Sequence, residues 1–137
     1  VLSLTLGFPL SAPNVLLFLV SLGFAFVLNF LIFWCVGLAG FWLTDIGFLF
    51  EAARIVIITL AGGIFPIAVF GVRAKKILLM LPFRFTIQFP SEILCGRITL
   101  AQALDSFALA ALWILILTLT SQFLWLRGLR RFAAVGS

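Results

Sequence analysis

Long apolar runs separated by short polar breaks form the main pattern along this chain. Residues 15–41 are apolar on all sides, with Asn29 the main exception, and this run exceeds the roughly 20 residues that cross a bilayer as a helix. Two further runs, residues 46–72 and 100–126, are expected to span as well. The pattern predicts an all-α, polytopic integral membrane protein with three full transmembrane helices in a single transmembrane domain, residues 1–137.

The residues before the second and third runs are typical of helix starts. Thr44 or Asp45 can cap the second helix, because a side-chain oxygen can accept a hydrogen bond from a free backbone N–H group. The sequence Thr-Leu-Ala-Gln at 99–102 fits a capping box, in which the first and last side chains each bond to the other's backbone N–H group. This predicts a clear start for the third helix.

Two glycines and a proline interrupt the second span. Gly62, Gly63 and Pro66 lie near its middle or beyond, and proline removes a backbone donor and clashes with the preceding turn. Two interpretations stay open. The break is either a packing notch with a kink, since glycine and proline are common in membrane helices, or a discontinuity that shapes a transport pathway.

The stretch that follows, residues 73–99, is an amphipathic loop that never becomes fully polar. Its prolines divide it into pieces too short to span, so we expect short re-entrant or interfacial helices, marked by Pro82, Phe83, Pro90 and Gly96. Lipid tolerates such backbone only where protein or a water-filled cavity satisfies its polar groups. The charged residues of the loop are expected to hold the pieces near a headgroup region or a cavity: Arg84, Glu92 and Arg97.

A candidate ion pair lies early in the second run. Glu51 and Arg54 are three residues apart, so they share one face of a helix. They are either a functional pair inside the membrane, where ionisable groups mark pathways, or an interfacial pair near a helix start. We favour the interfacial interpretation.

Composition excludes a soluble domain, because 65% of the residues are hydrophobic, only 9% are charged, and the mean hydropathy is +1.36. The net charge of +5 does not indicate nucleic-acid binding, since the few cations lie in breaks between apolar runs. Positions next to spans suit membrane topology and contact with anionic lipid headgroups instead.

The sequence offers little chemistry for catalysis. It contains no histidine, and its two cysteines, Cys35 and Cys95, form neither a metal motif nor an expected disulfide. Nucleotide-binding and hydrolase motifs are absent, so we expect neither enzyme activity nor a cofactor, and an energy-coupled transporter built from this chain would need a separate ATPase. The chain starts at Val1 without a basic leader, which suggests part of a longer polypeptide.

The order of several patches is similar to that of a known family. A span with FW near the next turn is followed by AGGIFPIAVF, by LPFRFTIQFPSEILCGRIT, and by a last span ending in WLRGLRRFAAVGS. Together they resemble the C-terminal half of ABC-2-type permeases, in particular a bacterial six-span group. The resemblance covers essentially the whole chain and rests on ordered patches rather than on a catalytic motif.

The resemblance implies a permease subunit in the bacterial inner membrane that forms a homodimer or heterodimer and pairs with separate ATPase subunits to export a substrate. The three spans would be the fourth to sixth, with re-entrant helices outside after the fifth and the basic segment 127–131 in the cytoplasm. Five cations then lie outside against three in the tail, contrary to the positive-inside tendency. Either re-entrant helices draw those cations to the interface, or the topology is inverted. The alternative function is a non-transporting scaffold subunit of a larger membrane complex.

Overall fold

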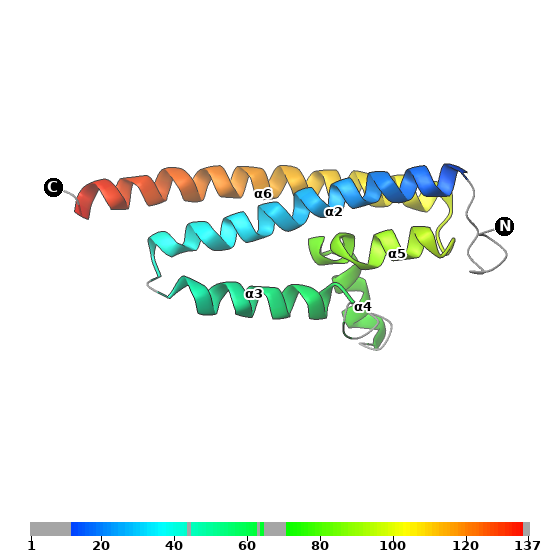
Figure 1. The fold of residues 1–137 in the computed structure, drawn as a ribbon, viewed down its shortest axis with the longest axis horizontal. Coiled ribbons are helices and arrows are strands. Elements are labelled where there is room, and N and C mark those ends of the chain that lie inside the picture. The colour runs from blue at the N-terminus through cyan, green and yellow to red at the C-terminus, as the bar shows by residue number, and fades with distance from the viewer. Residues whose placement is uncertain (1–11, 44, 63, 65–70, 136–137) are drawn as a thin grey trace.

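The computed structural model describes residues 12–43, 45–62, 64 and 71–135, and these residues form helices and short connections without a strand (Figure 1). The all-helical prediction is therefore confirmed for this part of the chain. The elements in order are α2 (Ala12–Leu38), η1 (Ala39–Phe41), α3 (Ile46–Leu60), α4 (Gly71–Met80), η3 (Pro82–Thr86), α5 (Gln88–Leu94) and α6 (Leu100–Val135).

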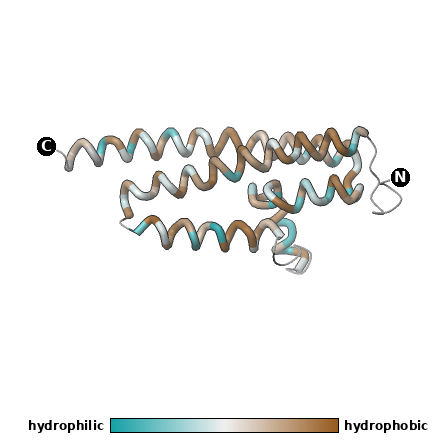
Figure 2. Tube along the Cα trace, viewed as in Figure 1, coloured by the Kyte–Doolittle hydropathy of each residue, from teal (hydrophilic) through white to brown (hydrophobic). Residues whose placement is uncertain are grey.

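Two helices are long and apolar enough to cross a membrane. They are α2 continued by η1, over Ala12–Phe41, and α6 over Leu100–Arg130. In the most apolar stretch of each helix, only 22% and 11% of the residues are buried, which is too little for core helices of a soluble protein. Figure 2 shows hydrophobic residues along most of both helices. Their exposed apolar surfaces are suited to lipid.

The second predicted span, residues 46–72, is not described as one continuous helix. Its described helix, α3, has 15 residues, or about 22 Å of length, which is less than the thickness of a bilayer core. Ala61 forms the C-cap, and the next described helix, α4, starts at Gly71. A third full span therefore stays a prediction.

The two long helices run in the same direction. In Figure 1, α2 and α6 both begin at the end of the bundle near the N-terminus and both finish toward the opposite end. Between them the chain has to return, and α3 makes the first part of that return. The segment formed by η3 and α5 lies beside the half of α2 that α3 does not reach, so α3 and η3–α5 occupy successive halves of one side of the bundle.

A cluster of buried residues lies where η3 and α5 pack against α2 and α6. Phe85 and Phe89 are fully buried there, together with Leu28 of α2 and Ala110 of α6. The Phe89 ring meets Phe85 edge to face at 5.7 Å between centroids, an arrangement that aromatic pairs prefer. Phe89 also meets the Phe107 ring of α6 edge to face at 5.1 Å, and together with Leu28 these rings hold η3–α5 against both long helices.

Local sequence explains how the helices begin. The Asp45 carboxylate accepts a hydrogen bond from the Phe48 N–H group at 3.2 Å and caps α3. At the start of α6, the Thr99 N–H group donates to Gln102 Oε1 at 3.1 Å, and the Gln102 N–H group donates to Thr99 Oγ1 at 3.4 Å. The predicted capping box is therefore confirmed.

Aromatic side chains join the three longest helices near the α2–α3 connection. Phe33 of α2 stacks on Phe50 of α3 with centroids 5.9 Å apart, and Trp34 stacks on Trp125 of α6 at 6.4 Å. Phe41 lies so close to Gly128 that a Cβ atom there would come within 2.7 Å of the ring atom Cγ. The absence of a side chain at residue 128 therefore permits the close approach of η1 and α6.

Candidate functional site

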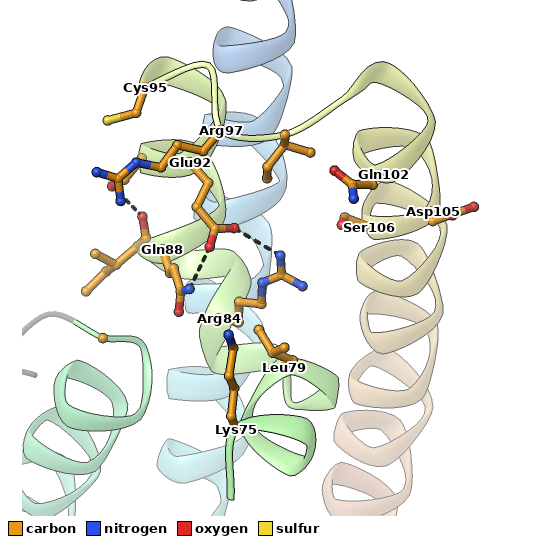
Figure 3. A pocket seen from close by; sticks show the side chains of 14 residues that line it. Lys75, Leu79, Arg84, Gln88, Glu92, Cys95, Arg97, Gln102, Asp105 and Ser106 are labelled. Carbon is orange, nitrogen blue, oxygen red and sulfur yellow. Dashed lines mark hydrogen bonds and ion pairs between the residues drawn. The ribbon is translucent and has the colours of Figure 1, made fainter. Parts of the chain in front are cut away.

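A polar cavity of about 670 Å³ lies between α4, η3, α5 and the first turns of α6 (Figure 3). Of the nine basic and four acidic residues in the chain, five line this cavity: Lys75, Arg84, Glu92, Arg97 and Asp105. A concentration of this kind is notable in so apolar a protein, because each charge near lipid requires compensation. The volume falls within the range typical of small-molecule sites.

Glu92 is the centre of a hydrogen-bonded network on one wall of the cavity. Its Oε2 atom accepts from Arg84 Nη2 at 3.0 Å, and its Oε1 atom accepts from Gln88 Nε2 at 2.7 Å (Figure 3). The Arg84 and Glu92 side chains are only 16% and 23% exposed. Gln88 and Glu92 are four residues apart on α5, so they share one helix face, and Arg84 reaches them from η3.

Two atoms of this network lack partners among the described residues. Arg84 Nε and Gln88 Oε1 are both buried without a hydrogen bond. Most buried polar atoms in proteins have a hydrogen-bond partner, so Arg84 Nε can donate and Gln88 Oε1 can accept one further bond. The network has spare hydrogen-bonding capacity.

The α6 side of the cavity is formed by one polar stripe. Gln102 and Ser106 project from α6 toward α5, whereas the Asp105 side chain points away from α5 (Figure 3). The spacing of four residues places Gln102 and Ser106 on the same face of the helix. Leu79, Ile87 and Ile98 add apolar wall to the cavity.

The predicted break is described in part. Gly62 follows the C-cap of α3 and has φ of 81°, a conformation that glycine adopts at little cost, and it lines the polar cavity. Gly63 and Pro66 lie outside the described residues. The helix α3 thus ends at Leu60, just before the first glycine of the predicted break.

The residues that mark the predicted re-entrant loop lie in η3, in α5 and in the turn after α5. Pro82 is at the start of η3 and Pro90 is in the first turn of α5, where a missing N–H group costs least, and both are buried. Phe83 in η3 is partly buried. Gly96 has φ of 65° in the exposed turn between α5 and α6.

The second candidate pair lies away from the cavity. Arg54 Nε is 3.5 Å from Glu51 Oε2, and the two side chains are 63% and 65% exposed on α3. Neither residue lines the polar cavity. The structure therefore does not bring the Glu51–Arg54 pair together with the glycine of the break.

Several residues that line the cavity carry no clear signal in the sequence. The sequence does not mark Lys75, Gln88 or Ser106 as site residues, and it marks Gln102 only as part of a helix cap, although Gln88 and Glu92, like Gln102 and Ser106, have helical spacing. That spacing is a usable signal within one helix. Nothing in the sequence indicates that the two stripes face the same cavity, because that depends on how η3 and α5 fold back beside α6.

The two cysteines lie in different surroundings. Cys35 on α2 is partly buried and its thiol donates to the Leu117 carbonyl at 3.8 Å, while Cys95 is exposed and lines the cavity. Both are free thiols.

Comparison with known proteins identifies the family. The family model described as ABC-2 family transporter protein matches residues 2–136. No curated protein and no solved structure matches the chain. Because the match extends over nearly the whole chain, and because two apolar helices have membrane-spanning length, this chain belongs to the ABC-2 family of transporter membrane proteins.

Proposed function

We propose that this chain forms part of the membrane subunit of an ATP-driven ABC-2 exporter in the bacterial inner membrane. The subunit works as a dimer, homomeric or heteromeric, with separate ATPase subunits that bind and hydrolyse ATP. The observation that carries the proposal is the family match over residues 2–136.

Three crossings of the membrane fit the directions of the long helices. Because α2 and α6 run the same way and both have spanning length, the chain between them has to recross the membrane. In this proposal α3 crosses one leaflet, and the following segment with η3 and α5 occupies the other leaflet as a re-entrant structure. The polar cavity then gives the irregular backbone of that segment access to water.

The distribution of cations agrees with a cytoplasmic C-terminus once the cavity is considered. Of the five cations between α3 and α6, Lys75, Arg84 and Arg97 line the cavity, and Arg84 is paired with Glu92. Only Arg73 and Lys76 remain outside the cavity, against the three arginines of the segment 127–131. The positive-inside tendency therefore favours the cytoplasm for the end of α6.

Reconstitution with the ATPase tests the function. The purified membrane protein alone should hydrolyse no ATP, whereas adding its cognate ATPase in proteoliposomes should give ATP-dependent export of the substrate. ATP hydrolysis stimulated by the membrane protein, but without movement of any candidate substrate, would favour a coupling or scaffold role. ATP hydrolysis by the membrane protein alone would contradict the proposal.

A further inference from the structure

We propose that the polar cavity between α4, α5 and α6 binds the phosphate group of a phosphate ester. The proposal concerns binding, and it holds whether or not the bound molecule is exported. It goes beyond the proposed transport function because it assigns a ligand class and a binding site to named residues.

The charge in the cavity favours an anion. Three cations and two acids line it, and Glu92 already forms an ion pair with Arg84. The Asp105 side chain points away from α5 although it lines the cavity, and three cations against two acids leave a net charge of +1 on the lining (Figure 3). Lys75 and Arg97 form no ion pair with any residue that the structure describes, so neither cation is held by Glu92 or Asp105.

The donors in the cavity suit phosphate in particular. Lys75 extends from α4 toward Arg84, so an ammonium group and a guanidinium group line the same cavity (Figure 3). Arg84 donates to Glu92 through Nη2, while its buried Nε has no partner among the described residues. Guanidinium and ammonium groups are the preferred partners of phosphate oxygens, and Gln102 and Ser106 can supply further donors.

The apolar part of the cavity wall suits the organic group of a phosphate ester. Leu79, Ile87 and Ile98 are apolar and lie in the same cavity as the cations. Because the cavity holds about 670 Å³, it has room for more than an inorganic ion. Two sources share this chemistry, namely the headgroup of an anionic phospholipid and a soluble phosphate ester.

The native thiol of Cys95 offers a direct probe, because it is exposed and lines the cavity. In the purified protein with Cys35→Ser, the rate of Cys95 modification is compared for an anionic and a cationic methanethiosulfonate reagent. We expect the anionic reagent to be favoured. Lys75→Gln should lower the ratio of the two rates by about fivefold, the effect expected from one nearby charge in a partly shielded site.

Lys76→Gln is the matched control, since Lys76 is the next residue on α4 but does not line the cavity. It should leave the ratio nearly unchanged. Arg97→Gln provides a second variant in case Lys75→Gln disturbs folding, which size-exclusion chromatography would reveal.

Protection of Cys95 then identifies the source of the phosphate. Slower modification with glycerol 1-phosphate, but not with glycerol, supports a soluble ester as ligand. Slower modification only in nanodiscs that contain phosphatidylglycerol, compared with nanodiscs of phosphatidylcholine, supports a lipid headgroup. Absence of protection in both experiments would overturn the proposal, and so would equal effects of Lys75→Gln and Lys76→Gln.

Discussion

The carboxylate of Glu92 serves two partners at once, because one oxygen accepts from Arg84 and the other from Gln88. The chain contains a second pair for comparison, Glu51 with Arg54, which is solvent-exposed on its helix. Burial determines how much each pair contributes to stability. A partly buried guanidinium that loses its carboxylate keeps its desolvation cost, whereas an exposed one is compensated by water.

Replacing the acid in each pair tests this difference. Glu92→Gln should lower the free energy of unfolding by about 1–3 kcal/mol, because it leaves the Arg84 charge without its partner in a partly buried site. Glu51→Gln is the control and should cost less than about 0.5 kcal/mol. Thermal unfolding of the purified proteins in detergent gives the comparison. Equal losses of stability in the two variants would contradict the claim that burial determines the contribution of each pair.

A second residue-scale prediction concerns the contact between η1 and α6. In Gly128→Ala the new Cβ atom would overlap the Phe41 ring, so we expect a loss of about 1–3 kcal/mol in stability. Gly23→Ala on α2 is the control, because no atom lies within 4 Å of a Cβ atom there, and alanine should stabilise that helix by about 0.5–1 kcal/mol.

Unfolding midpoints in detergent measure both glycine variants. The double variant Gly128→Ala with Phe41→Leu should lose less than the sum of the two single losses, because the smaller side chain relieves the overlap. If Gly128→Ala has no effect on the midpoint, the close approach of η1 and α6 does not contribute to stability.

At the scale of helices and turns, the sequence predicts local hydrogen bonds better than it predicts how the helices pack. The capping box at Thr99 and Gln102 and the cap at Asp45 involve residues within three positions of each other, so they are visible in the sequence. The position of η3–α5 depends on Phe85 and Phe89, whose partners lie on α2 and α6. Contacts between residues so far apart in sequence leave no periodic signal.

For the candidate site too, the sequence indicates single residues better than it indicates their arrangement in space. The sequence indicated that Arg84, Glu92 and Arg97 would lie near a headgroup region or a cavity, and all three line the cavity. Lys75 lies on α4, within the stretch 73–99 for which the sequence predicts short helices but not which cavity they line. The α6 stripe contains Gln102, whose capping role alone already accounts for its presence in the sequence. Neither contribution could be predicted without knowing how the chain folds back.

A double variant at the end of α3 tests whether the helix break is needed for transport. Gly62→Ala places a side chain where φ is positive, and with Pro66→Ala it favours extension of the helix through the break. We expect this double variant to insert and dimerise normally but to lose most export per ATP hydrolysed in proteoliposomes. If the break serves only packing, export should persist.

Gly71→Ala is the matched control for this prediction. Gly71 also has a positive φ, 80°, and no atom lies within 4 Å of a Cβ atom built there, but its substitution does not extend α3. An equal loss of export in the two variants would assign the effect to backbone strain rather than to the break.

At the scale of the whole molecule, the parallel directions of α2 and α6 predict the topology. Ala12 at the start of α2 and Ala134 near the end of α6 should lie on opposite sides of the membrane, with Ala134 in the cytoplasm. Ala12→Cys and Ala134→Cys are introduced separately, with Cys35 and Cys95 replaced by serine. An impermeant thiol reagent applied to intact spheroplasts should label residue 12 only. Labelling of residue 134 alone would invert the orientation, and equal labelling of both would exclude the parallel arrangement as a membrane topology.

The length of α6 has a mechanical consequence. Its 36 residues extend over about 54 Å, far more than the hydrocarbon thickness, and the helix contains one glycine and no proline. Such a rod has no built-in hinge, since sharp bends in helices arise at proline, glycine–serine pairs or bulges. A tilt or axial rotation of α6 beside the polar cavity therefore also moves the arginines at the other end of the helix.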